Sequence, residues 1–118
     1  MATSPERQAY RDNAAQREFI AKNILEQLGG GRFVMFTGAK ERVITEKGLR
    51  MRLPSNLTKD RISHVEIRLE PNDTYTVEAQ RQRGVSPMKV VATQSDVYAE
   101  NLQDTFHSLT GLITRFGQ

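Results

Sequence analysis

The sequence of 118 residues lacks cysteine and tryptophan altogether. Without cysteine there is no disulfide framework and no thiolate metal site, and such a composition is typical of the reducing cytoplasm. No apolar run approaches the roughly 18 residues that a membrane span needs, and the first residues lack the apolar segment of a signal peptide. We therefore expect a cytoplasmic protein of a bacterium or its host cell, with no membrane association.

Residues that carry catalysis or bind metals are also few. Histidine occurs only at His64 and His107, and neither has a second ligand at the spacing of a metal site. No serine stands in a nucleophile motif such as G-x-S-x-G. Glu66 and Glu78 could face each other across a sheet, but arginines near each of them favour surface ion pairs over acid–base catalysis. We therefore expect a protein that is not an enzyme and that holds no metal or cofactor.

The chain does have the composition of one globular domain over residues 1–118. Hydrophobic residues make up 37% of it and charged residues 26%, so it can bury a core without disulfides or metals. The formal net charge is only +3, but its distribution is uneven. Residues 32–68 hold nine Lys or Arg against four Asp or Glu, a local excess of +5. Such an excess suits an anionic partner.

A helix is predicted from Pro5 to Leu28, with Ser4 as its side-chain cap. In the second half of this segment, apolar residues recur every four positions and form a stripe. Residues 1–14 are largely polar, and we expect them to be frayed or mobile. The three glycines that follow Leu28 end the helix.

Beyond the glycines, apolar residues alternate with polar ones at the period of two that is typical of half-buried strands. The clearest pair runs over residues 65–69 and 75–80, which Pro71-Asn72-Asp73 joins as a hairpin turn. The other predicted strands cover residues 32–37, 42–45, 49–53 and 88–92.

The last predicted element is a second helix, which Ser95 or Asp96 caps and which Gly111 could end. The order of helix, five or six short strands and helix favours an α+β fold with short antiparallel connections. We expect two layers, with two amphipathic helices covering the apolar face of the sheet. The apolar stripe of the second helix consists of Tyr98, Leu102, Phe106, Leu109 and Ile113.

The segment Gly29–Lys40 combines glycines with a lysine, as a nucleotide-binding loop does. A P-loop, however, follows a strand and opens a helix with Lys-Ser/Thr, whereas here a helix precedes the glycines and Glu41 stands at the hydroxyl position. We therefore interpret the glycines as a helix end, followed by a strand and a tight turn. Thr37-Gly38-Ala39 is a candidate contact loop.

Arginines and lysines occur repeatedly on the predicted strands. Arg50 and Arg52 alternate with apolar residues and so share the polar face of the sheet, and Arg81 and Arg83 are expected near its rim. Such a face can follow a phosphate backbone, although no aromatic residue interleaves with it as a stacking platform. A solvated face that protects the sheet edges is the alternative interpretation. The candidate nucleic-acid-binding residues are Lys40, Arg42, Lys47, Arg50, Arg52 and Arg68.

Several short motifs also occur in a fixed order along residues 20–116. They are Leu28-Gly29-Gly30, Thr37-Gly38-Ala39-Lys40, Gly48-Leu49, Asp73-Thr74-Tyr75, Arg83-Gly84, Val97-Tyr98 and Thr110-Gly111-Leu112. As a set they resemble a family of small uncharacterised proteins encoded by bacteriophages, prophages and mobile elements. The resemblance implies a phage or mobile-element origin, and it implies no activity and no site residue.

Two functions from different classes fit these observations. The first is a non-enzymatic accessory protein that binds DNA or RNA through the basic sheet face. The second is a protein-binding module that self-associates as a homo-oligomer or inhibits a host protein, and that uses the sheet edge or the loop at Gly38. The sequence leaves both open.

Overall fold

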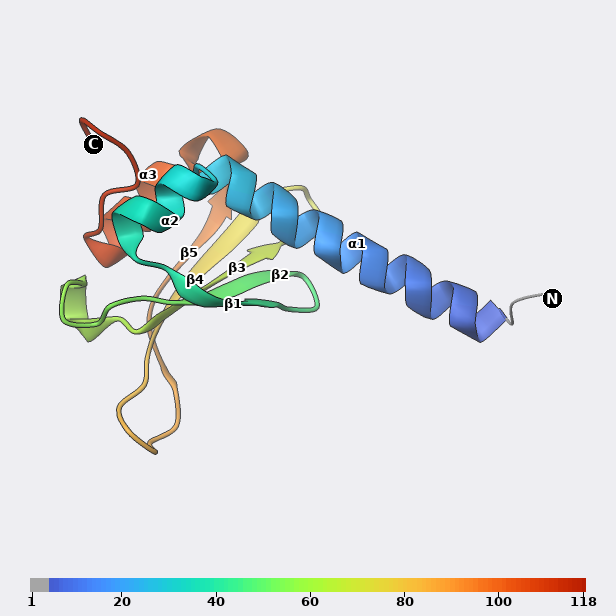
Figure 1. The fold of residues 1–118 in the computed structure, drawn as a ribbon, viewed down its shortest axis with the longest axis horizontal. Helices are drawn as coiled ribbons and strands as arrows, with labels where there is room; N and C mark the ends of the chain where they lie inside the picture. The colour runs from blue at the N-terminus through green and yellow to red at the C-terminus, as the bar shows by residue number, and fades with distance from the viewer. Residues whose placement is uncertain (1–4) are drawn as a thin grey trace.

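The computed structural model describes the backbone of residues 5–118 and their side chains from residue 13 onward, so the predicted cap Ser4 lies outside the described residues. The described part is an α+β fold, as predicted (Figure 1). In chain order its elements are α1 (Pro5–Leu28), α2 (Gly31–Thr37), β1 (Lys40–Ile44), β2 (Gly48–Arg52), β3 (His64–Leu69), β4 (Tyr75–Arg81), β5 (Lys89–Val97) and α3 (Leu102–Thr110), with 3-10 turns at Lys59–Arg61 and Ala99–Asn101.

Residues 40–97 form a five-stranded antiparallel meander in the order β1-β2-β3-β4-β5. Helices α1, α2 and α3 lie over one face of this sheet (Figure 1), and we call the other face the open face. Because side chains alternate along a strand, every second residue points toward the helices and is removed from water. The buried residues of this kind on β2, β3 and β4 are Leu49, Met51, Val65, Ile67, Tyr75, Val77 and Ala79.

The hairpin of β3 and β4 confirms the prediction made from alternation and turn residues. Its register pairs residues 64–69 with residues 75–80 without a break. In the turn, Asn72 Oδ1 accepts hydrogen bonds from the Thr74 amide (3.3 Å) and hydroxyl (2.7 Å), which is the local bonding that makes Asn a turn residue. Strands β1 and β2 also lie within two residues of their predicted bounds.

Helix α1 has the predicted bounds, but only its second half packs on the sheet. Ile24 and Leu28 are fully buried, whereas residues 13–19 are all exposed. Figure 1 shows the first half of α1 extending past the sheet. The mobility predicted for residues 1–14 stays a prediction, and residues 1–4 lie outside the described part of the chain.

The strand predicted over residues 32–37 is wrong, because this segment forms helix α2. Gly29 and Gly30 have φ values of 124° and 61°, which glycine adopts readily and which let the chain turn directly after α1. Phe33 and Thr37, one helical turn apart, are then both buried. A short apolar run fits a buried helix as well as a strand, so the tertiary contacts of Phe33 decide between them.

Those contacts join α2 to α3 through two matching helix ends. In α2, Thr37 Oγ1 donates to the Phe33 carbonyl (2.7 Å) and accepts from the Ala39 amide (3.2 Å). Gly38 then closes the helix in the left-handed conformation, with its amide bonded to the Val34 carbonyl. The side chain of threonine thus satisfies backbone groups that the helix end would leave unpaired.

Helix α3 repeats this arrangement. Thr110 Oγ1 donates to the Phe106 carbonyl (2.8 Å) and accepts from the Leu112 amide (3.2 Å), and Gly111 is again left-handed. The two phenylalanine rings, Phe33 and Phe106, meet edge to face with their centroids 4.9 Å apart. The two helices therefore share one buried aromatic contact, a geometry that adds to the burial energy of the rings.

Strand β5 is longer than predicted, and the second helix begins later. Ser95 and Asp96, predicted as helix caps, belong to the strand, and α3 begins only at Leu102. Asp96 has a φ of 56° and lies where the β4–β5 register shifts. Because Asp tolerates this backbone at a bulge as well as in a turn, the local signal did not distinguish the two. The predicted end at Gly111 is confirmed.

Candidate nucleic-acid interface

The open face of the sheet carries polar side chains in rows across the strands. The register of β2, β3 and β4 places residues from all three strands side by side. One row consists of Arg52, His64 and Gln80, and the next of Arg50, Glu66 and Glu78.

Three cations gather where β1 and β2 meet this face. Lys40 lies opposite Arg52 across the two strands, and Arg50 points to the same face because it lies two residues before Arg52. Arg52 Nη1 is 3.4 Å from Glu41 Oε1, but both side chains are more than half exposed, so this ion pair compensates little. We call Lys40, Arg50 and Arg52 the basic surface.

The charges of this surface affect the pKa of the neighbouring His64. Burial lowers the pKa of His64 from its ordinary value, and the charges of Arg50 and Arg52 lower it further, while Glu41 opposes them. Its Nδ1 lies 2.9 Å from Ser63 Oγ. The two arginines thus act in the same direction on one imidazole of the open face, and Glu41 offsets part of their effect.

A polar depression of about 600 Å³ adjoins the basic surface. Lys40, Arg52 and His64 line one side of it, and Gln82 and Gly84 of the β4–β5 loop line the other. Its remaining lining residues are Glu41, Leu53, Pro54, Ser55, Asn56 and Ser63. The depression has room for a polar group, and its described lining includes no Phe, Tyr or Trp.

Arg68, which was predicted as part of the interface, lies in a network of its own. Its Nη1 is 3.0 Å from Glu66 Oε2 and 2.9 Å from Glu78 Oε2, and Gln80 Nε2 donates to the other oxygen of Glu78 (3.0 Å). The two glutamates face each other, as the sequence suggested, and Arg68 forms an ion pair with both, which leaves one negative charge in excess. We call these four residues the ion-pair network.

Two further predicted residues lie away from the basic surface. Arg42 is exposed on β1, where its Nη1 donates to the Ala39 carbonyl (3.4 Å). Lys47 lies in the turn between β1 and β2, at the opposite end of the strands from Lys40 and Arg52. Three of the six predicted residues are therefore brought together and the other three are not.

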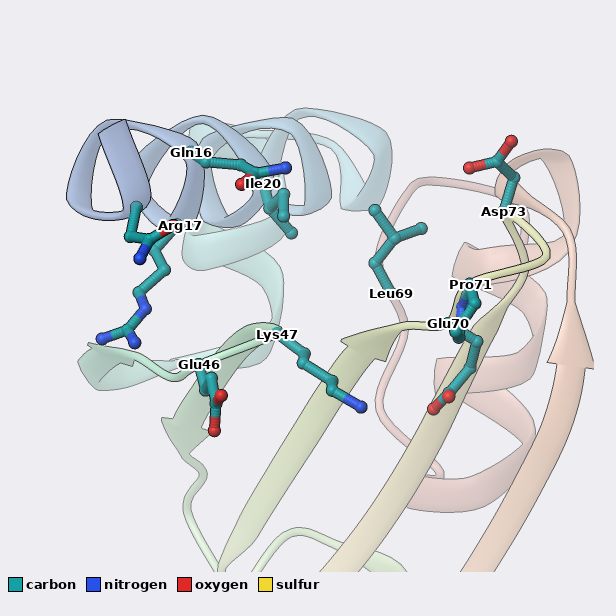
Figure 2. Close-up of a pocket in the computed structure, with 10 residues that line it drawn as sticks. Gln16, Arg17, Ile20, Glu46, Lys47, Leu69, Glu70, Pro71 and Asp73 are labelled. Carbon is teal, nitrogen blue, oxygen red and sulfur yellow. The ribbon is translucent and has the colours of Figure 1, made fainter. Parts of the chain in front are cut away.

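Lys47 lines a groove of about 440 Å³ between α1 and two turns of the sheet (Figure 2). Figure 2 shows Arg17 of α1 on one side of it, and Glu70 and Asp73 of the β3–β4 turn on the other. Glu46 adds a third carboxylate to the two cations. Because the charges are mixed, this groove has no preference for an anion.

The candidate contact loop proves to be mostly internal. The side chains of Thr37 and Ala39 are buried and belong to the end of α2 described above. Gly38 is exposed, and a side chain at its position would meet Pro54. The loop thus positions Lys40 at the start of β1 and offers little surface of its own.

Sequence reasoning missed cations that the meander carries to the same end of the strands. Lys59 and Arg61 lie in the β2–β3 connection, and Lys89 starts β5 opposite Arg81. Antiparallel pairing brings the β2–β3 connection and the β4–β5 loop to the same end of the strands. The signal available in the sequence was that both of these connections contain a cation.

Comparison with known proteins gives no match, either to a family model, to a curated protein or to a solved structure. Among the described residues, no helix has the length and apolar character needed to cross a membrane. No group of three His, Asp or Glu that could hold a metal ion occurs in that part of the chain either.

Proposed function

We propose that this protein binds nucleic acid through the basic surface, as a non-enzymatic accessory protein of phage or mobile-element origin. One observation carries the proposal: Lys40 lies directly opposite Arg52 on a face that the helices leave open. Like charges in this position destabilise a sheet. Folding alone does not require the pair, whereas a phosphate backbone would neutralise it.

The chemistry of the surface favours phosphate over bases as the group that is contacted. The described part of the depression has no Phe, Tyr or Trp on which a base could stack. Phe33, Tyr75 and Phe106 are instead buried in the hydrophobic core. We therefore expect binding with little sequence preference and with a steep dependence on salt.

The test is fluorescence anisotropy with labelled DNA duplex, DNA single strand and RNA, at several salt concentrations. We expect binding at low salt. On a duplex, the logarithm of the binding constant should fall linearly with the logarithm of the salt concentration, with a slope of about −0.9 for each phosphate contacted. Absence of binding to all three ligands at low salt would overturn the proposal.

Self-association is a second candidate, and the exposure of α1 favours it. Phe19 of α1 is 70% exposed. Figure 1 shows the first half of this helix extending past the sheet, and an isolated helical stretch of this length is marginal in water. Packing against α1 of a second copy would cover Phe19. Sedimentation equilibrium of the protein and of Phe19→Ser tests this, since a monomer in both samples excludes it.

A further inference from the structure

A second group of cations lies on the β4–β5 loop, away from the basic surface. Arg81, Arg83 and Lys89 line a concavity of about 230 Å³ together with Ser86 and Pro87. No acidic side chain lines it, and within the described residues none of the three cations forms an ion pair. Three positive charges thus share one small space without compensation.

The pairing of the strands makes this arrangement unfavourable for folding. Arg81 lies directly opposite Lys89 in the β4–β5 register, and like charges in this position repel. Arg81 Nη1 donates to the backbone carbonyl of Asp60 (3.3 Å), which holds the guanidinium near the β2–β3 connection. A bound anion would convert the repulsion into attraction.

The two groups of cations lie on opposite faces of the sheet, the basic surface on β1 and β2 and the second group at the base of the β4–β5 ribbon. Along β4, Arg81 shares the face of the buried Ala79, whereas Gln80 points to the open face. Gln82 and Gly84 correspondingly line the depression beside the basic surface. The loop between the strands is formed by a tight turn, in which the Ser86 amide bonds to the Arg83 carbonyl (3.0 Å), and Figure 1 shows it protruding from the body of the protein.

We propose that Arg81, Arg83 and Lys89 form a phosphate subsite and that the β4–β5 ribbon enters a groove of double-stranded nucleic acid. The subsite holds the phosphates on one side of the groove, and the basic surface holds those on the other. A two-stranded ribbon fits the major groove of B-DNA, and cations on the two faces of the sheet from which this ribbon projects suit a space with a phosphate backbone on each side. This inference rests on the proposed function and adds to it the element that enters and the class of ligand.

The experiment compares the protein with Arg83→Gln/Lys89→Gln on a labelled DNA duplex. The matched control is Arg17→Gln/Lys22→Gln, which removes the same two charges from exposed positions of α1. We expect the salt slope of duplex binding to fall by about 0.9 for each substituted cation of the subsite, with no change in the control. Thermal melting should show both variants folded, and Lys89→Gln alone should melt no lower than the wild type because it removes a repulsion.

Two outcomes overturn the inference while leaving the proposed function intact. They are an unchanged salt slope in the subsite variant, and single strands that bind as tightly as the duplex. Inorganic phosphate tests the subsite separately from nucleic acid. We expect phosphate to shift backbone amide resonances within residues 82–89 in the wild type and not in Arg83→Gln/Lys89→Gln. Unshifted resonances in the wild type would contradict the subsite, whether or not nucleic acid binds.

Discussion

Two regions of the open face differ in how their charged side chains are paired. In the ion-pair network, Arg68 lies between Glu66 and Glu78, and every charge has a partner within hydrogen-bonding distance. In the basic surface, two strands further along, Lys40 and Arg52 face each other across a strand pair with only an exposed Glu41 nearby. The first region pairs its charges within the sheet, whereas the second leaves positive charge exposed where we propose that nucleic acid binds. Composition alone does not distinguish them, because both consist of Arg and Lys on strands.

The largest expected effect is on binding, when the basic surface loses its charge. For Lys40→Gln/Arg52→Gln we expect the affinity for a DNA duplex at low salt to fall by about a hundredfold, since two charge-assisted phosphate contacts are lost. Anisotropy titration measures this loss. Arg17→Gln/Lys47→Gln, in the groove of mixed charge, is the control. An equal loss in that control would show that only net charge matters.

Removing Arg68 tests whether the ion-pair network stabilises the fold. In Arg68→Gln the two glutamates face each other without a cation at largely buried positions, and we expect unfolding to become easier by about 2 kcal/mol. Urea denaturation at neutral pH measures this free energy. Arg115→Gln, which breaks only the exposed pair with Asp104, should cost less than about 0.5 kcal/mol. If the two variants are equally stable, the network has no structural role.

The same network predicts how stability depends on pH. The hydrogen bond from Gln80 lowers the pKa of Glu78, and Arg68 lowers it further, against the opposing effect of burial. The unfolded chain therefore binds a proton more readily at this group. Its contribution to stability is complete above the ordinary glutamate pKa of about 4.5 and is lost as the pH falls through the lower folded value. Acid denaturation of Glu78→Gln should accordingly be less steep than that of the wild type, and identical curves would contradict this.

The smallest expected effect is a change in His64. When a phosphate neutralises Arg50 and Arg52, the pKa of His64 should rise toward its ordinary value. Glu41 is the carboxylate that already opposes these arginines. An NMR titration of the imidazole with and without duplex DNA measures the rise, and an unchanged pKa would contradict contact at these arginines.

Local sequence signals predicted the parts of the fold that local chemistry determines. Alternation over residues 65–69 and 75–80 with a Pro-Asn-Asp turn between them predicted the hairpin of β3 and β4 from local signals alone. The segment 32–37 could not be assigned in this way, because its helix depends on Phe33 meeting Phe106, which lies 73 residues further along the chain. The prediction that Asp96 caps the second helix was wrong for a related reason, since aspartate occurs both at bulges and at helix caps.

The candidate site was predicted as a basic sheet face, but the residues that belong to it were predicted only in part. An excess of Lys and Arg on strands indicated a basic face, and Lys40, Arg50 and Arg52 do lie together on the open face. Arg68 could not be separated from them, because its partner Glu78 is on another strand and the pairing depends on register. Lys89 was missed although it lies in the predicted strand 88–92, because its place opposite Arg81 depends on the register of β4 and β5.

The matching ends of α2 and α3 have a consequence for how the core opens. The hydroxyl groups of Thr37 and Thr110 each donate to a carbonyl and accept from an amide at buried positions, so exchange of these protons with water requires the helix end to come apart. Since Phe33 and Phe106 are in contact, neither end separates without disturbing the other. Hydrogen exchange should therefore show the Ala39 and Leu112 amides, 73 residues apart in the chain, opening as one cooperative unit with a single free energy.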